Sequence, residues 1–96
     1  MQPSDNRSPA SWQVYMIFCS DNSYYTGITN NLTRRLAQHR AKAGAKYFRG
    51  RQPLEVVYLE RGHNRSSASR REAEIKKLSR RAKVALIDSV LNQLTE

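Results

Sequence analysis

The sequence predicts an α+β domain: a small three-stranded antiparallel β-sheet flanked by α-helices, in the order β-β-α-α-β-α-α. Two observations lead to this fold class. Residues 12–28 hold two runs rich in aromatic and β-branched side chains, separated by a turn signal, which is typical of a β-hairpin. Residues 67–94 hold apolar residues three or four positions apart, which is typical of helices that pack on one side.

The hairpin accounts for the first two expected strands. Residues 12–19 form a nearly continuous apolar run, and Ser-Asp-Asn-Ser at 20–23 predicts a turn before the second strand at 24–28. Because successive side chains of a strand point to opposite faces, the first strand has two distinct sides. One face carries Trp12, Val14, Met16 and Phe18, and the other carries Gln13, Tyr15, Ile17 and Cys19.

The middle of the chain predicts a helix, a basic segment and a third strand. Residues 29–31 offer N-cap candidates for a helix from Leu32 to about Lys42, with Leu32 and Leu36 on its inner face. Residues 43–52 are a basic loop or short helix bounded by glycines, and Pro53 marks a boundary. Residues 54–60 predict the third strand.

The last third of the chain predicts two helices after a polar connection at 61–66. The first helix covers residues 67–78, with Ala68, Ile75 and Leu78 on one side. Ser79 is expected to cap the second helix. Its apolar side is made of Val84, Ile87, Leu91 and Leu94.

Length and charge limit the classes of function. We expect one domain at residues 12–94, preceded by a flexible polar tail at 1–11, because 96 residues support one modest core. The formal charge of +9 favours nucleic acid as partner over a membrane. No apolar run reaches the roughly 18 residues of a membrane span. The single cysteine, Cys19, excludes an internal disulfide and fits a reducing cytoplasm.

Two tyrosines and a following helix are the first candidates for chemistry. The hairpin brings Tyr25 close to Tyr15, and Gly27 would permit a close approach of a backbone or ligand. Arg35 and His39 are four residues apart and therefore share a helical face, where they could hold a phosphate and a water. Two structural alternatives stay open: cross-strand aromatic packing for the tyrosines, and a solvated basic face for Arg35 and His39.

Glu72 is the most interesting acid because it lies at the edge of the expected apolar face within a strongly basic stretch. Such a carboxylate is suited to one divalent cation. Two structural alternatives stay open here too. Ser69 and Glu72 fit a capping box if the helix begins at Ser69, and Glu72 with Lys76 fits an ordinary i,i+4 ion pair.

A one-sided excess of basic residues predicts phosphate contacts. Aromatic residues beside them, Tyr47 and Phe48, could stack on bases. One cysteine and two histidines without ligand spacing do not support a zinc site. The expected basic contacts lie in the segments 43–52 and 70–83 and are Lys46, Arg49, Arg51, Arg71 and Lys76.

Taken together, the motifs resemble the GIY-YIG nuclease superfamily, in particular its small standalone bacterial members. The resemblance rests on Val14-Tyr15-Met16, on Tyr25-Thr26-Gly27, and on Arg35 ten residues after Tyr25. It continues through residues 44–58 and 71–77, and it covers residues 12 to 86. It implies a three-stranded sheet flanked by helices and phosphodiester hydrolysis that depends on Mg²⁺ or Mn²⁺.

The resemblance also implies roles for five positions. Tyr15 would help to activate the attacking water, and Tyr25 would line the site. Arg35 would stabilise the charge that develops on the phosphate, and Glu72 would bind the metal. His39 matches a histidine that some members carry one turn after the arginine.

Three positions depart from the pattern of the superfamily. Gln13 replaces the first glycine, Ile28 stands where excision-repair relatives have a lysine, and Val84 lies near the place of an asparagine in some relatives. The favoured hypothesis is a metal-dependent DNA endonuclease that acts on duplex, branched or damaged DNA in repair or recombination. The alternatives are a catalytically weak DNA-binding module with the same fold, and a small RNA-binding protein.

Overall fold

The computed structural model of the protein describes residues 11–41 and 45–94, and the expected hairpin supplies two of its three strands. β1 (Trp12–Cys19) pairs antiparallel with β2 (Tyr24–Thr29), and Asn22 in the turn adopts a φ of 70°, which asparagine tolerates. β3 (Pro53–His63) pairs antiparallel with the other side of β1, so the strand order is β2-β1-β3. The predicted α+β class with a three-stranded antiparallel sheet is confirmed.

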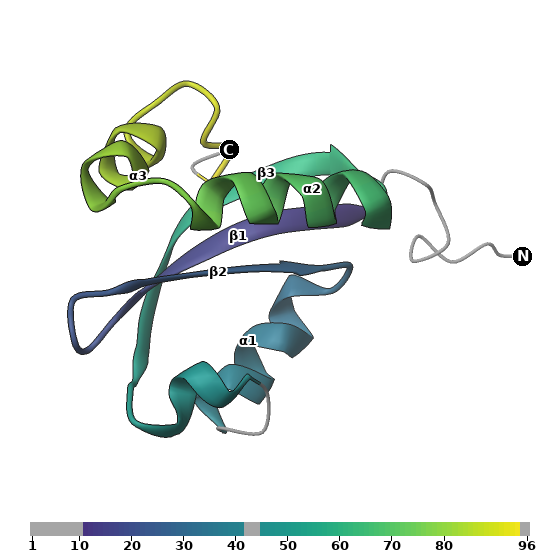
Figure 1. Cartoon of the computed structure of the whole chain (residues 1–96). Coiled ribbons are helices and arrows are strands. Elements are labelled where there is room, and N and C mark those ends of the chain that lie inside the picture. The colour runs from purple at the N-terminus through teal and green to yellow at the C-terminus, as the bar shows by residue number, and fades with distance from the viewer. Residues whose placement is uncertain (1–10, 42–44, 95–96) are drawn as a thin grey trace, which may run out of the picture.

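The sheet lies between two helical layers. α1 (Leu32–Arg40) and the short 3₁₀ helix η2 (Lys46–Arg49) cover one face, and α2 (Arg65–Lys76) with α3 (Arg80–Ile87) covers the other. Figure 1 shows α2 and α3 above the strands and α1 below them. We call these the α2/α3 face and the α1/η2 face. α2 packs mainly against β2 and β1.

The alternation of side chains in β1 divides the core into two clusters. Val14 and Met16 point to the α2/α3 face, whereas Tyr15 and Ile17 point to the α1/η2 face, as the sequence predicts. The first cluster also contains Tyr58, Ala68, Ile75 and Leu86, and the second contains Cys19, Phe48 and Leu59.

Each of the α-helices α1, α2 and α3 begins at a side chain that caps its free amides. Asn31 accepts a hydrogen bond from the backbone of Arg34, and Ser79 accepts one from Ala82, as expected for the caps of α1 and α3. α2 begins at Arg65, two residues earlier than predicted, because Asn64 and Ser67 form a reciprocal capping box. The alternative of a capping box between Ser69 and Glu72 is therefore wrong.

The two largest differences from the sequence prediction lie in β3 and the C-terminal segment. β3 continues to His63, which pairs with Trp12, instead of ending near residue 60. α3 ends at Ile87, so the apolar spacing beyond it does not form a helix. The backbone N–H of Gln93 instead donates to Leu59 at 2.8 Å, and residues 92–93 cover the outer edge of β3.

Parts of three sequence predictions lie outside the described residues. These are the flexible tail, except for Ser11, the C-terminal end of the first helix near Lys42, and the start of the basic segment at 43–44. In the part of the chain that is described, no helix has the length and apolar character to cross a membrane.

Candidate active site

The centre of the α1/η2 face is a hydrogen bond between two buried side chains. Oη of Tyr15 lies 2.8 Å from Nε2 of His39, and both residues are fully buried. Tyr15 reaches this place because its side chain leaves the central strand β1 on the α1/η2 face. His39 reaches it from the last turn of α1, two turns after Leu32, which also packs inward.

Gly27 makes room for the Tyr15 hydroxyl. Gly27 pairs directly with Tyr15 across the β1–β2 ladder. A Cβ atom at this position would lie 2.6 Å from Oη of Tyr15 and 2.9 Å from Cε2 of Tyr25. The sequence predicted that Gly27 permits a close approach, and in this structure the Tyr15 side chain approaches it, while a nucleic-acid contact at Gly27 stays a prediction.

Aromatic rings enclose the Tyr15–His39 pair. The Phe48 ring lies 4.6 Å from the His39 ring and 4.9 Å from the Tyr25 ring, centroid to centroid. Tyr25 is half-buried and lies 5.1 Å from His39 in an edge-on arrangement. Cross-strand aromatic packing, the structural alternative for Tyr15 and Tyr25, is therefore present, since their rings lie 6.2 Å apart.

Burial keeps both members of the pair neutral. Desolvation, reinforced by Tyr25, raises the pKa of Tyr15, and the positive charge of Arg35 acts in the opposite direction. Desolvation also lowers the pKa of His39 to about 4, with a further contribution from Arg35. At neutral pH the phenol keeps its proton and the imidazole is uncharged.

One atom of the pair has no partner. Nδ1 of His39 is buried and has no hydrogen-bond partner among the described residues. An unsatisfied buried polar atom costs about 1–3 kcal/mol and therefore needs an explanation, of which a catalytic role is one. His39 is therefore not a residue of a solvated basic face, which was the structural alternative from the sequence.

Arg35 borders this pair from the same helix. Its guanidinium donates a hydrogen bond to Gln38 at 2.9 Å and is close enough to Tyr15 and His39 to influence the pKa of both. The residue is half-buried, so part of its fork stays accessible. A guanidinium in this position can bind a phosphate that approaches the tyrosines.

Glu72 lies in the opposite layer, on α2. Its carboxylate binds the ammonium of Lys76 at 3.2 Å, which is the i,i+4 pair that the sequence left open. Among residues 11–41 and 45–94, no hydrogen bond or ion pair joins Glu72 to Tyr15, Tyr25, Arg35 or His39. The structure thus brings four of the five predicted catalytic residues together, and the convergence of Glu72 with them stays a prediction.

The predicted nucleic-acid contacts divide into free and paired side chains. Lys46 and Arg49 are exposed and have no ion-pair partner in the described part of the chain. Arg51 binds Asp21 and lies 4.0 Å over the Tyr47 ring. Arg71 binds Glu60 and Glu74, both at 3.1 Å.

The two aromatic candidates for base stacking are already occupied. Tyr47 lies between Arg51 and the Tyr25 ring, and its hydroxyl donates to Ser23. Phe48 is fully buried, so the expectation that it stacks on a base is wrong in this conformation. Base stacking was predicted for both residues because their neighbours in the sequence are basic. In the structure their rings instead pack over His39 and Tyr25.

Comparison with known proteins shows the family of the chain. Residues 11–85 match the sequence profile of the GIY-YIG catalytic domain. The chain belongs to the GIY-YIG family. A UPF0213 protein of Natronomonas pharaonis is 50% identical over 78 residues, which cover 81% of this chain and 92% of the relative. A UPF0213 protein of Halobacterium salinarum is 52% identical over 73 residues, which cover 76% and 95% of the two chains.

A solved structure shares the fold. The solution NMR structure of a UPF0213 protein from Bacillus halodurans matches with a TM-score of 0.54 and 38% identity, over 86% of this chain and 88% of that one. Membership of the GIY-YIG family makes the chain a member of a nuclease family, and nucleic acid is the class of substrate that the family implies.

GIY-YIG nucleases typically use a divalent metal ion. Within the described residues, no three His, Cys, Asp or Glu side chains lie together to hold an ion by themselves. Glu72 still suits a hard cation, because its carboxylate is partly exposed and already binds the charged Lys76. Mg²⁺ commonly takes one or two carboxylates and completes its shell with water and substrate phosphate. The donor set therefore fits an ion that Glu72 shares with the substrate.

Two features of the site were not predicted from the sequence. Phe48 covers His39, and the only signal for this was a Tyr-Phe pair between glycines. The partner of the Tyr15 hydroxyl was not identified either, although His39 was named as a site residue. The sequence did contain a signal for this contact. Tyr15 lies on the strand face that α1 covers, and His39 lies on the inner face of α1, so the two side chains meet in the core.

Proposed function

We propose that this protein is a metal-dependent DNA endonuclease that hydrolyses phosphodiester bonds in duplex or branched DNA, with a role in repair or recombination. The observation that carries the proposal is the buried Tyr15–His39 hydrogen bond opposite Gly27. A purely structural tyrosine does not require a glycine across the ladder or a histidine with an unsatisfied nitrogen. A reactive phenol held in one orientation accounts for both.

The proposed roles follow from the position and charge of each residue. His39 orients the phenol through its Nε2 and accepts the phenol proton, and the resulting Tyr15 phenolate takes a proton from the attacking water. Because the pKa of Tyr15 is raised in the free protein, the phenol becomes a base only when positive charge beside it increases. Arg35 supplies fixed positive charge for the phosphate, and Tyr25 forms the accessible wall of the site.

Glu72 is the proposed ligand for Mg²⁺ or Mn²⁺. When bound, the ion would polarise the phosphate and neutralise the leaving oxygen. α2, which carries Glu72, packs against β2, the strand that carries Tyr25 and Gly27, so the proposed site would span the β2 edge of the sheet.

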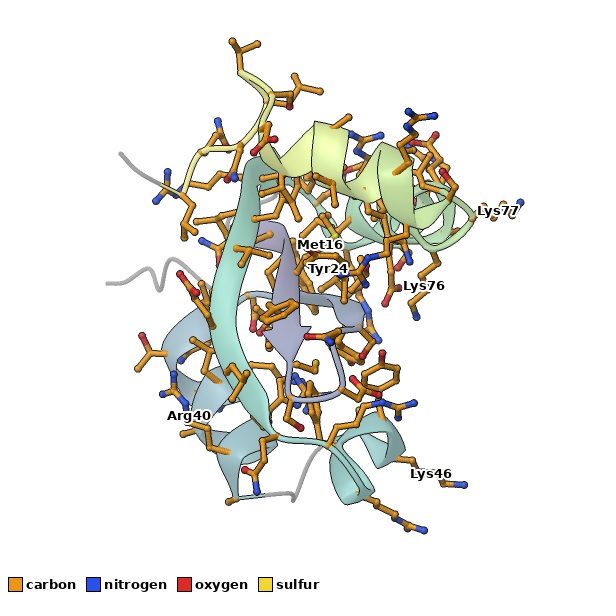
Figure 2. The ribbon with its side chains drawn as sticks, turned by 90° about the vertical axis from the view of Figure 1, so that its left-hand side faces the viewer. Met16, Tyr24, Arg40, Lys46, Lys76 and Lys77 are labelled. Carbon is orange, nitrogen blue, oxygen red and sulfur yellow. The ribbon has the colours of Figure 1, made fainter. Side chains whose placement is uncertain are left out.

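The exposed lysines favour a polyanion along this edge. Figure 2 shows Lys76 and Lys77 at the end of α2 and Lys46 of η2 projecting from the same side of the molecule, whereas Arg40 projects from the other side. Together with the charge of +9, this arrangement supports a DNA strand that runs between α2 and η2. Arg51 and Arg71 would contact DNA only after leaving their acidic partners.

A second candidate function is a DNA-binding module without turnover. The observation that favours it is that Tyr15 is fully buried, so no water reaches its hydroxyl in this conformation. A single-stranded RNA-binding protein has less support, since Phe48 is buried and Tyr47 is covered by Arg51. Cytoplasmic location remains a proposal that rests on the single unpaired cysteine.

The deciding experiment is nicking of supercoiled plasmid and of a branched DNA with Mg²⁺ or Mn²⁺. We expect cleavage by the intact protein and loss of cleavage in Glu72→Ala and Arg35→Ala, with DNA binding retained. Glu74→Ala and Arg34→Ala are matched controls on the same two helices, and both should cleave. Both controls alter exposed side chains. Cleavage that survives in Glu72→Ala and Arg35→Ala would refute the proposed site, and salt-sensitive binding without any cleavage would favour the binding module.

A further inference from the structure

The acids near α2 are held in two different ways. Glu60 accepts hydrogen bonds from Tyr58 and Arg71 and lies 2.7 Å from His63, and Glu74 accepts from Arg71. Glu72 binds a single lysine, Lys76, whose side chain is 55% exposed. A lysine carries a compact charge on a flexible stem and leaves an ion pair more easily than Arg71, whose planar guanidinium donates to two acids at once. Glu72 is therefore the acid whose partner is most easily displaced.

The ammonium of Lys76 occupies the position beside the Glu72 carboxylate that a metal ion would occupy. Its Nζ lies 3.2 Å from Oε2 of Glu72. An ammonium and a divalent cation repel each other and compete for the same carboxylate oxygens. An exposed i,i+4 pair is worth only a few tenths of a kcal/mol by itself, so the competition is readily reversed.

Lys76 also lies where DNA would arrive. Figure 2 places it with Lys77 and Lys46 on one side of the molecule. A phosphate on this side attracts the ammonium, and every step that moves Lys76 towards the phosphate frees Glu72. When the metal binds first, it displaces Lys76 from Glu72, and the freed ammonium is then available to a phosphate.

We propose that Lys76 is a built-in counterion of Glu72 that couples metal binding to DNA binding. In the free protein it occupies the carboxylate and keeps the metal affinity low. Bound DNA draws it away, so that the metal binds more tightly to the complex than to the free protein. By thermodynamic reciprocity, the metal strengthens DNA binding by the same factor. This inference rests on the proposed function, because it takes Glu72 as the metal ligand.

The test measures binding of Mn²⁺ without cleavage, in a Tyr15→Phe background, with and without a short DNA duplex. The unbound Mn²⁺ is followed by its electron paramagnetic resonance signal. Lys76→Gln should bind Mn²⁺ about two- to fivefold more tightly than the parent in the absence of DNA, and it should gain less affinity when DNA is added. Lys77→Gln removes the same charge from the next residue of the same helix end, where the described residues contain no carboxylate partner.

Lys77→Gln is expected to match the parent, which separates competition at Glu72 from a general change in charge. Glu72→Gln should bind little Mn²⁺ with or without DNA. Equal Mn²⁺ affinity in Lys76→Gln and Lys77→Gln, or an undiminished effect of DNA in Lys76→Gln, would overturn the proposal. Because the readout is binding, absence of cleavage by the intact protein would refute the proposed nuclease without deciding this coupling.

Discussion

Each face of the sheet buries one tyrosine whose hydroxyl is hydrogen-bonded to another side chain. The two hydrogen-bonded pairs differ in whether their remaining polar atoms also have partners. On the α2/α3 side, Tyr58 donates to Glu60 at 2.6 Å, and Glu60 is also bound by Arg71 and His63. On the α1/η2 face, Tyr15 meets His39, whose second nitrogen has no partner among the described residues. Both tyrosines are fully buried, so burial does not distinguish them.

The difference lies in how completely the polar groups are satisfied. The carboxylate of Glu60 joins β3 to α2 and leaves no unpaired charge, which is how a buried ionic group contributes to structure. The Tyr15–His39 pair is neutral and incomplete, and it lies beside a positive charge that belongs to Arg35. An incomplete polar pair with a nearby fixed charge is the arrangement expected where chemistry takes place.

The largest expected effect compares the same chemical change on the two faces. Tyr15→Phe and Tyr58→Phe each remove one buried phenol oxygen. We expect Tyr15→Phe to lower the rate of DNA cleavage by about 10²–10⁴-fold, the range for loss of an acid–base group, while Tyr58→Phe changes it little. Plasmid nicking rates measure this, and urea titrations show whether each variant is folded. Similar rates for the two variants would remove the functional difference between the faces.

A second prediction concerns the space that Gly27 provides for Tyr15. Gly27→Ala places a methyl group within 2.6–2.9 Å of the two tyrosine rings, which His39 and Phe48 hold from the other side. We expect the free energy of unfolding to fall by about 1–3 kcal/mol through overpacking. Gly50→Ala is the matched control, because no atom lies within 4 Å of its added methyl group. Urea titrations measure the free energy of unfolding of both variants. Equal values would show that β2 shifts to accommodate the methyl group without loss of stability.

The sequence was sufficient for the parts of the fold that local patterns determine. Alternation in residues 12–19 predicted both faces of β1, Ser79 was recognised as a helix cap, and Asn31 was one of three cap candidates at residues 29–31. The extent of β3 and the end of α3 were wrong because both depend on distant partners. His63 extends the strand by pairing with Trp12, and Asn92 and Gln93 bind β3 in place of another helical turn.

The candidate site was predictable as a set of residues and only partly as a geometry. Tyr15, Tyr25, Arg35 and His39 gather because α1 packs on the β1–β2 hairpin. Charge was a poorer guide, since Arg51 and Arg71 looked free in the sequence but bind Asp21 and Glu60. An ion pair between residues 11 or 30 positions apart leaves no local pattern, so it can be found only from the structure.

A third prediction tests whether the α2/α3 face is purely structural. Glu60→Gln keeps the shape of the side chain but removes the charge that Arg71 and His63 face. We expect the free energy of unfolding at pH 7 to fall by about 2 kcal/mol, with cleavage changed less than in Tyr15→Phe. Burial acts against ionisation of Glu60, but hydrogen bonds from Tyr58 and His63 and the charge of Arg71 leave its pKa lowered.

The lowered pKa of Glu60 adds a pH dependence with a definite sign. A carboxylate with a lowered folded-state pKa stabilises the protein above its ordinary pKa, and the contribution disappears as pH falls through the folded-state value. The stability difference between Glu60→Gln and the parent should therefore shrink from neutral towards strongly acidic pH. Urea titrations at pH 7 and pH 3 measure it, and a difference that stays constant would mean that the charge of Glu60 contributes nothing.

The smallest effect we expect separates the two faces by the pH at which each loses stability. Burial lowers the pKa of His39 to about 4, so the folded protein binds fewer protons at this site than the unfolded chain between about pH 6.5 and pH 4. Stability from neutral His39 is complete above that window and is lost as pH falls through it. We expect a loss of about 1.5–2 kcal/mol between pH 7 and pH 5 that is absent in His39→Gln and kept in His63→Gln. If His39→Gln lost stability as steeply as the parent, His39 would already be charged or hydrated in the fold, and the α1/η2 face would be as fully satisfied as the α2/α3 face.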